Sequence, residues 1–238
     1  MRAMLLAAGL GTRLKPFTDH HPKALAFVNG KSLLQRNVEY LRDQGITDII
    51  INVHHFADQV IRLVQLKNNF GMNITISDET DEVLETGGGL LKAGWFFNDG
   101  APFLLMNVDI LTDLNIRHMV DSHNEADSLA TLAVTNRRTS RYLLFDEHKI
   151  LCGWRNTITG AERISCEKNE YFPLAFSGIH IISPKIFAKI NMKGKFSMID
   201  LYLALAKNEC IRGYDHSGTK FMDVGTPASI MEVEKIFK

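Results

Sequence analysis

The chain has 238 residues, 45% of them hydrophobic, and its 27 basic residues balance its 27 acidic residues. A net charge of zero gives no overall field to attract nucleic acid or an anionic membrane, so neither is expected as a partner. No apolar run reaches the roughly 18 residues of a membrane span. The apolar run after Arg2 is too short for a signal-peptide core, so a cytoplasmic protein is expected.

The cysteines Cys152, Cys166 and Cys210 are odd in number and widely spaced, which favours structural thiols in a reducing compartment over a disulfide framework. No HExxH or CxxC motif accompanies the histidines, so a zinc site is not expected.

Apolar runs and amphipathic runs alternate through the first 110 residues. Strands are expected at 1–7, 48–53, 73–77 and 102–106, and helices at 32–44, 57–67 and 89–97. This βαβ alternation predicts an α/β fold, Rossmann-like, with a mixed, mostly parallel sheet and helices on both faces. Ligands of such sheets bind beyond the carboxyl ends of the strands.

Beyond residue 110 the expected elements are shorter and lie among polar loops. Strands are expected at 128–134, 142–145, 176–182 and 220–222, and helices at 184–190, 199–207 and 227–237, the last with Thr226 as its N-cap. No linker separates the two parts. The sequence therefore predicts one domain, 1–238, made of two halves, 1–110 and 111–238.

Glycine-rich stretches offer two familiar nucleotide sites, and both fail. The sequence GKS at residues 30–32 resembles the end of a P-loop, but Leu25 stands where the first glycine is required, so we interpret it as the turn that starts a helix. The GLG at residues 9–11 matches the start of a dinucleotide fingerprint. However, Leu14 occupies the third glycine position, and no carboxylate follows the strand 48–53 to hold a ribose.

The stretch LAAGLGTRLKP, residues 6–16, is better explained as a triphosphate-binding turn. Its two glycines let backbone amides approach phosphate oxygens, and Thr12 adds a hydroxyl donor. Arg13 supplies a planar fork of donors, and Lys23 adds a second cation on the turn after Pro22.

The same stretch, LAAGLGTRLKPFT followed by PKA, resembles the signature of the sugar-1-phosphate nucleotidyltransferases. Three later motifs also match: ETGGG at 85–89, NVD at 107–109 and DVGTP at 223–227, so the resemblance covers nearly the whole chain. It implies a nucleotide-binding half, 1–110, and a half, 111–238, that binds the sugar and completes the metal site.

The resemblance implies attack by the 1-phosphate oxygen of a sugar on the α-phosphorus of a nucleoside triphosphate, with release of pyrophosphate. That nucleophile is already ionised at neutral pH, so catalysis consists of positioning and charge neutralisation. Asp109 and Asp223 each follow a strand, and the resemblance assigns both to Mg²⁺, which suits two carboxylates with phosphates and water. It places Arg13 on the β- and γ-phosphates and Lys23 on the α-phosphate or the incoming sugar phosphate.

The remaining implied contacts divide between the two substrates. Those to the nucleotide are Leu6, Ala7, Ala8, Gly9, Gly11, Thr12, Arg13, Lys23, Thr86, Gly87 and Gly88. Those to the sugar are Asn107, Arg155, Ser177 and Gly178. For Arg155 one hypothesis is a carboxylate partner, the lactate group of N-acetylmuramate, because arginine binds carboxylates bidentately, and the favoured alternative is a surface residue without contact to substrate.

The ETGGG motif and the chain length most resemble the N-acetylmuramate 1-phosphate uridylyltransferases of peptidoglycan recycling, which predicts UTP as donor. GTP with a heptose or mannose phosphate is the alternative, and CTP with phosphocholine comes third. Two departures are the PKA at 22–24 in place of PKP, and Trp154-Arg155-Asn156 where many relatives have Glu-Lys, a pair that Glu167-Lys168 could supply.

A regulatory protein of the same fold that binds nucleotide sugars without turnover is the non-enzymatic alternative. Such proteins are expected to lose the phosphate-binding cations or the metal carboxylates, and this chain keeps Arg13, Lys23, Asp109 and Asp223, which favours an enzyme. The oligomeric state is left open.

Overall fold

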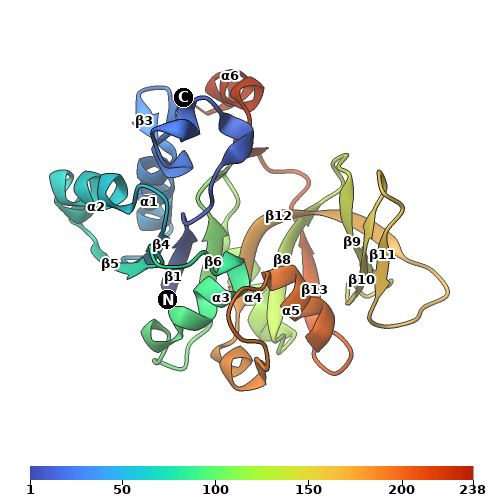
Figure 1. Cartoon of the computed structure of the whole chain (residues 1–238). Helices are drawn as coiled ribbons and strands as arrows, with labels where there is room; N and C mark the ends of the chain where they lie inside the picture. Colours follow the sequence, from blue (N-terminus) through green and yellow to red (C-terminus); the bar gives the residue numbers. More distant parts are fainter. Residues whose placement is uncertain (238) are drawn as a thin grey trace.

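A single large sheet organises the computed structural model, which describes residues 1–237 (Figure 1). Its strands in spatial order are β11 (Glu162–Ile164), β10 (Leu151–Asn156), β9 (Arg141–Phe145), β12 (Phe172–Ile182), β6 (Phe103–Asn107), β1 (Arg2–Leu6), β4 (Asp48–Val53) and β5 (Asn73–Asp78). Two further strands branch from this order: β8 (Ala130–Thr135) pairs with β12, and β13 (Ile211–Asp215) pairs with β8. The strands β6, β1, β4 and β5 run parallel, whereas β12 is antiparallel to β6, β8 and β9. The predicted mixed, mostly parallel sheet is confirmed: the first half supplies the parallel strands β6, β1, β4 and β5, and the second half extends the sheet through the antiparallel strand β12 and the parallel pair β8 and β13.

Helices cover both faces of the parallel part. They are α1 (Leu33–Asp43), α2 (Ala57–Leu66), α3 (Glu85–Lys92), α4 (Ile116–Glu125) and α5 (Met198–Leu205). The last helix, α6 (Pro227–Ile236), packs away from this sheet, in a separate core cluster. In β1, Ala3 and Leu5 join the core cluster of α1, α2 and α4, while Met4 and Leu6 join that of α3 and α5. This alternation follows from the period of two in a strand, and burial on both faces explains why β1 is apolar from Ala3 to Leu6.

Several expected elements differ in the structure. The helix expected at 89–97 begins four residues earlier as α3, and its second part is a separate 3₁₀ turn, Gly94–Phe96. The segment expected as a helix at 184–190 is also a 3₁₀ turn, Pro184–Lys189. The sequence interpretation did not include α4, β10, β11 or β13.

Two short strands outside the main sheet matter for the site. β7 (Ile110–Thr112) pairs antiparallel with β14 (Phe221–Asp223), so that Asp223 lies opposite Ile110. The amide of Val224 also donates a hydrogen bond to the carbonyl of Asp109, at 2.8 Å. This pairing brings β14, from the C-terminal part of the chain, next to the segment that follows the carboxyl end of β6. Thr226 caps α6, as predicted, by accepting a hydrogen bond from the Ser229 amide.

Among residues 1–237, no helix has the length and apolar character that crossing a membrane requires.

Candidate active site

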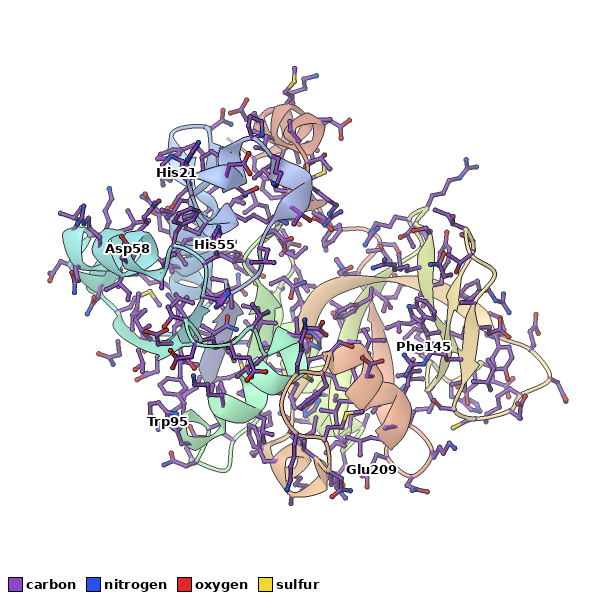
Figure 2. All side chains as sticks on the ribbon, viewed as in Figure 1. His21, His55, Asp58, Trp95, Phe145 and Glu209 are labelled. Atoms are coloured by element: carbon purple, nitrogen blue, oxygen red, sulfur yellow. The ribbon has the colours of Figure 1, made fainter. Side chains whose placement is uncertain are left out.

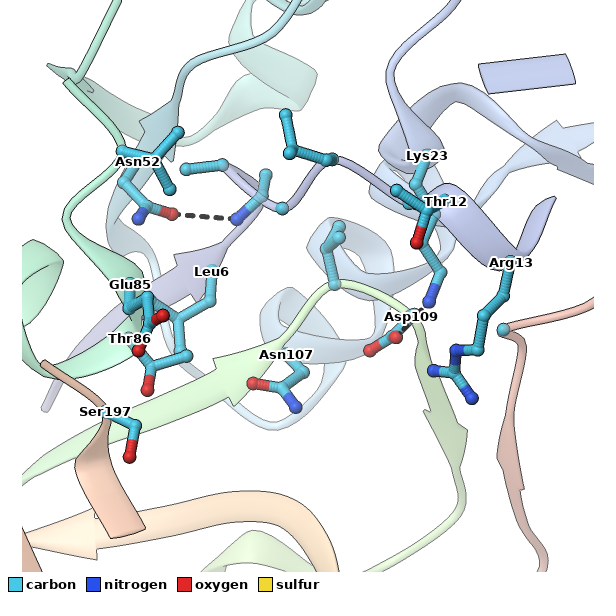
Figure 3. Close-up of a pocket in the computed structure, with 18 of the residues that line it drawn as sticks. Leu6, Thr12, Arg13, Lys23, Asn52, Glu85, Thr86, Asn107, Asp109 and Ser197 are labelled. Atoms are coloured by element: carbon cyan, nitrogen blue, oxygen red, sulfur yellow. Dashed lines mark hydrogen bonds and ion pairs between the residues drawn. The ribbon is translucent and has the colours of Figure 1, made fainter. Parts of the chain in front are cut away.

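A cavity of about 520 Å³ opens at the carboxyl ends of β1 and β6 (Figure 3). It lies where an open α/β sheet places its ligands. Its lining is formed by Leu6, Ala7, Ala8, Gly9, Leu10, Gly11, Thr12, Arg13, Lys23, Asn52, Val83, Glu85, Thr86, Asn107, Val108, Asp109, Lys195, Ser197 and Gly225. Residues 6–13 of the predicted triphosphate-binding turn therefore line the cavity together with Lys23 and Asp109, whereas residues 14–16 do not.

The turn after β1 is shaped by short-range hydrogen bonds. Gly11 has a φ of 64°, a conformation that favours glycine, and its carbonyl accepts hydrogen bonds from the Leu14 amide at 2.8 Å and from the Thr18 hydroxyl at 3.0 Å. A Cβ atom at Gly11 would lie 2.9 Å from the Cβ of Lys23. Glycine here thus allows the lysine-bearing turn to lie directly against the loop.

Asn52, at the end of β4, fixes the start of the same loop and was missed by the sequence interpretation. Its side-chain oxygen accepts a hydrogen bond from the Ala7 amide, and its side-chain NH₂ donates to Oε1 of Glu79, both at 2.8 Å. Glu79 is fully buried and its Oε2 has no hydrogen-bond partner, and burial raises the pKa of this carboxyl. The signal that was available is the polar Asn52 at the end of an otherwise apolar strand.

The four residues expected to do the chemistry come together. The Lys23 ammonium donates to the Asp109 carboxylate, and their side chains are only 11% and 17% exposed. The Arg13 guanidinium lies 4.0 Å from Oδ1 of Asp223. Figure 3 shows the end of the Lys23 side chain at Asp109 and the guanidinium of Arg13 close by; Arg13 comes from the glycine-rich turn and Lys23 from the turn after Pro22.

Asp223 is held in an unfavourable environment for a charge. Its side chain is 41% exposed overall, but Oδ1 is buried and accepts no hydrogen bond. Burial raises the pKa of this carboxyl, the nearby Asp109 raises it further, and Lys23 and Arg13 oppose the shift. A carboxylate oxygen with no donor beside a second carboxylate is a site that favours a cation.

The donor set fits Mg²⁺ better than a transition metal. Within the part of the chain that the structure describes, no group of three or more His, Cys, Asp or Glu side chains is placed to hold a metal. Mg²⁺ is commonly bound by one or two carboxylates while phosphates and water complete its shell. Asp109 and Asp223 are the two carboxylates of this site that could hold such an ion.

The ETGGG segment contributes less directly than its resemblance implied. Thr86 lines the cavity, but Gly87 and Gly88 are buried, and their amides donate hydrogen bonds to the carbonyl of Phe196 at 2.9 and 3.2 Å. Two cavity residues close to this segment, Lys195 and Ser197, were missed by the sequence interpretation, because nothing in their local sequence marks them as part of a site.

The residues expected to contact the sugar are dispersed. Asn107 lines the cavity, and a Cβ at Gly178 would lie 2.7 Å from its side-chain nitrogen. Ser177 is 1% exposed and its hydroxyl is hydrogen-bonded to His216 at 2.7 Å. Arg155 lies on β10 and forms an ion pair with Glu162. Arg155, Ser177 and Gly178 are not among the cavity-lining residues.

Comparison with known proteins agrees with this geometry. The family model described as "Nucleotidyl transferase" matches residues 2–238. An N-acetylmuramate alpha-1-phosphate uridylyltransferase from Caulobacter vibrioides is 31% identical over 98% of this chain and 95% of that protein. A mannose-1-phosphate guanyltransferase from Yarrowia lipolytica is 27% identical over 97% of this chain, which spans 62% of that longer protein.

Among solved structures, HddC from Yersinia pseudotuberculosis complexed with GMP-PN is similar with a TM-score of 0.80 and 25% identity, covering 100% of this chain and 99% of that one. The chain therefore belongs to the nucleotidyl transferase family. Within it, the chain is an enzyme of the sugar-1-phosphate nucleotidyltransferase class.

Proposed function

We propose that the chain catalyses a Mg²⁺-dependent transfer of a nucleotidyl group from a nucleoside triphosphate to a sugar 1-phosphate, giving a nucleotide sugar and pyrophosphate. UTP and N-acetylmuramate 1-phosphate are the proposed pair. The observation that carries the reaction is that the glycine-rich turn, Lys23, Arg13 and Asp109 line one cavity. Asp223 is not among the lining residues, but its carboxylate lies 4.0 Å from the Arg13 guanidinium.

In the proposed reaction the cationic and the anionic residues of the site have different roles. Amides of the turn and the Arg13 guanidinium bind the triphosphate, because oriented N–H groups and a fixed cation neutralise phosphate oxygens. Lys23 is held beside Asp109 and so keeps an ammonium close to the reacting phosphates. Mg²⁺, when bound by Asp109 and Asp223, supplies further charge neutralisation of the phosphates.

A general base is not needed in this reaction. The attacking phosphate oxygen is already ionised, and the barrier arises from bringing two polyanions together. Fixing both reactants in the correct geometry can provide on the order of 7 to 11 kcal/mol. Preorganised positive charge provides the rest.

The choice of UTP and N-acetylmuramate 1-phosphate rests on the Caulobacter relative, which matches nearly the full length of both chains. The guanyltransferase relative and HddC complexed with GMP-PN support the second candidate, GTP with a mannose or heptose phosphate.

A substrate screen decides between these candidates. UTP, GTP, CTP and dTTP are each combined with the 1-phosphates of N-acetylmuramate, mannose, heptose and glucose, and pyrophosphate release is measured with Mg²⁺ and with excess EDTA. The expected result is the highest kcat/KM for UTP with N-acetylmuramate 1-phosphate and no release in EDTA. A GTP pair with the highest value would establish the second candidate instead.

Two variants make the screen specific to this site. Arg13→Ala removes a cavity cation and is expected to abolish release, while Arg117→Ala removes an exposed arginine on α4 and is expected to leave it unchanged. Normal turnover by purified Arg13→Ala would refute the assigned site.

A further inference from the structure

The Asp223 carboxylate interacts with cations from both halves of the chain. Arg13, in the triphosphate-binding turn, belongs to the first half. Arg137 belongs to the second half, on the connection between β8 and β9, and the sequence interpretation did not include it. In Figure 2 this half lies around Phe145 of β9, on the opposite side of the view from His55 of the parallel half.

Two contacts hold the Arg137 side chain in place. Its Nη2 donates a hydrogen bond to the carbonyl of Phe176 on β12, at 2.8 Å. Its guanidinium carbon lies 5.2 Å from the centre of the Phe221 ring on β14, within the range of a cation–π interaction. This half-buried arginine therefore links the β8–β9 connection to β12 and to β14.

The contact with Phe221 places Arg137 on the face of β14 that carries Asp223. Successive side chains of a strand point to opposite faces, so Phe221 and Asp223, two residues apart, share one face. Burial lowers the pKa of the Arg137 guanidinium, and the charge of Asp223 opposes that shift. Arg137 therefore lies close enough to attract the carboxylate.

Arg137 attracts this carboxylate without occupying its buried oxygen. Among residues 1–237, neither Nε of Arg137 nor Oδ1 of Asp223 has a hydrogen-bond partner, although both atoms are buried. A Cβ at Gly225 would lie 2.9 Å from the same Oδ1, so the glycine keeps the space beside this oxygen open. Oδ1 is therefore available to the cation of the proposed function.

The segment of β12 that Arg137 contacts lies against the cavity lining. The pairing of β12 with β8 shifts register after Phe176, which marks a bulge. In this bulge Gly178 has a φ of 71°, and a Cβ there would lie 2.7 Å from the side-chain nitrogen of Asn107, which lines the cavity. Arg137 thus connects the strand of Asp223 to backbone that is packed against the cavity.

We propose that Arg137 is a positioning residue, which holds the Asp223 carboxylate in place for its cation by linking β14 to the bulge of β12. This inference rests on the proposed function, in which Asp223 binds Mg²⁺. Attraction by Arg137 fixes the carboxylate, and the missing hydrogen bond leaves Oδ1 to the metal. Asp109 is held differently, because Lys23 donates to it directly.

Three variants of the full-length protein test this role. Arg137→Ala removes the charge and both contacts, and Arg137→Lys keeps the charge without the planar fork of donors. Arg138→Ala is the matched control, because it removes an exposed cation from the same connection. Each variant is measured for Tm, for both KM values and for the Mg²⁺ concentration that gives half of the maximal rate.

Hydrogen exchange of the Val224 amide supplies a second readout that needs no turnover. This amide donates to the carbonyl of Asp109 and directly follows Asp223, so its exchange rate reports how firmly the end of β14 is held. A merely structural role of Arg137 would lower Tm without changing the Mg²⁺ requirement.

For Arg137→Ala we expect the half-saturating Mg²⁺ concentration to rise about tenfold and Val224 to exchange about tenfold faster, the factor for one lost hydrogen bond of a charged group. Arg137→Lys should show smaller changes, about threefold, and Arg138→Ala should behave like the wild type. An unchanged Mg²⁺ requirement or unchanged exchange in Arg137→Ala would overturn the proposal. If Arg137→Ala does not fold, the same two criteria apply to Arg137→Lys.

Failure of the proposed function would be recognised separately. If the wild type releases no pyrophosphate with any pair, the reaction is wrong, and Val224 exchange alone then tests the link between Arg137 and β14. Faster exchange in Arg137→Ala than in Arg138→Ala would support the link. Equal exchange in the two variants would overturn it.

Discussion

The two walls of the cavity are held in place in different ways. The turn at Gly11 is closed by hydrogen bonds from Leu14 and Thr18, only three and seven residues away. The other wall includes Lys195 and Ser197, and the segment that carries them is held by the hydrogen bond from the Met198 amide to Thr86, 112 positions earlier in the chain. A wall built from local turn chemistry leaves a compact motif in the sequence, whereas a wall built from long-range contacts leaves separate fragments whose connection only the fold reveals.

The largest expected effect concerns charge on the first wall. Asp109→Asn removes a negative charge that faces Lys23 and, in the proposed function, a ligand of Mg²⁺. We expect kcat to fall by about 10²–10³, the cost of losing one preorganised charge contact in an active site. Initial rates of pyrophosphate release measure it, and Asp121→Asn, at an exposed position of α4, is the control. A change of less than tenfold would contradict the role of Asp109.

The second prediction tests how the first wall is anchored. Asn52→Ala leaves the Ala7 amide and Glu79 without their partner, and both hydrogen bonds are buried. Each buried polar group left unpaired costs roughly 1–3 kcal/mol, so the free energy of unfolding is expected to fall by about 2–4 kcal/mol. Denaturant unfolding measures the loss. Asn124→Ala, at an exposed position of α4, is expected to change stability by less than about 0.5 kcal/mol.

The same substitution tests which substrate the first wall serves. Ala7 lines the cavity and begins the triphosphate-binding turn, so Asn52→Ala is expected to raise the KM for the triphosphate more than the KM for the acceptor. The opposite pattern would show that the first wall does not serve the triphosphate.

The third prediction concerns pH. Burial, reinforced by Asp109, raises the pKa of Asp223 in the folded state above its value in the unfolded chain. The folded state therefore binds this proton more tightly, and stability falls as pH rises from the unfolded pKa of about 3.9 through the raised value. Asp223→Asn is expected to have a higher Tm than the wild type at pH 7, with a difference that shrinks toward pH 4.

Activity is expected to depend on pH in the opposite direction to stability. Asp223 must be ionised to bind a cation, so kcat/KM of the wild type falls as pH decreases through the raised pKa of this carboxyl. Asp223→Asn should be inactive although it is more stable. A lower Tm for this variant at pH 7 would show that the charge of Asp223 stabilises the fold.

The parallel strands β1, β4 and β6 were predictable because each is largely an apolar run buried on both faces. The bounds of β4 agree with the sequence prediction, and those of β1 and β5 differ by one residue at the ends where they differ. The sequence prediction started this helix at Gly89, whereas α3 starts at Glu85. The prediction was wrong because glycine is a poor helix former and three residues of α3 are glycines. Contacts of these glycines with residues 194–196 and with the Asn52–Glu79 pair override that low helix propensity.

The missed elements lack such patterns for physical reasons. In α4, a buried histidine, His123, occupies an inward position and is satisfied by a hydrogen bond with Thr131 at 2.9 Å. In β13, Arg212, Gly213 and Asp215 leave no apolar run, and the ring of Phe145 lies against Gly213, 3.1 Å from where a Cβ would be. Each case depends on a partner distant in the sequence.

The site also combines residues that a local sequence pattern marks with residues that only long-range contacts bring to the cavity. The motifs at 6–16, 107–109 and 223–227 were recognised as short strings, and the structure brings them together. Asn52, Lys195 and Ser197 were missed, because each joins the cavity through contacts made only in the folded chain.

The smallest expected effect is at Arg155, which sequence analysis connected to an acceptor carboxylate. Its guanidinium pairs with Glu162 on β11, the two side chains are 40% and 37% exposed, and Arg155 is outside the cavity lining. Because exposed pairs are worth about 0–1 kcal/mol, Arg155→Ala should leave both KM values and the Tm nearly unchanged. A higher acceptor KM in Arg155→Ala would place the acceptor site at the antiparallel strands β9–β11.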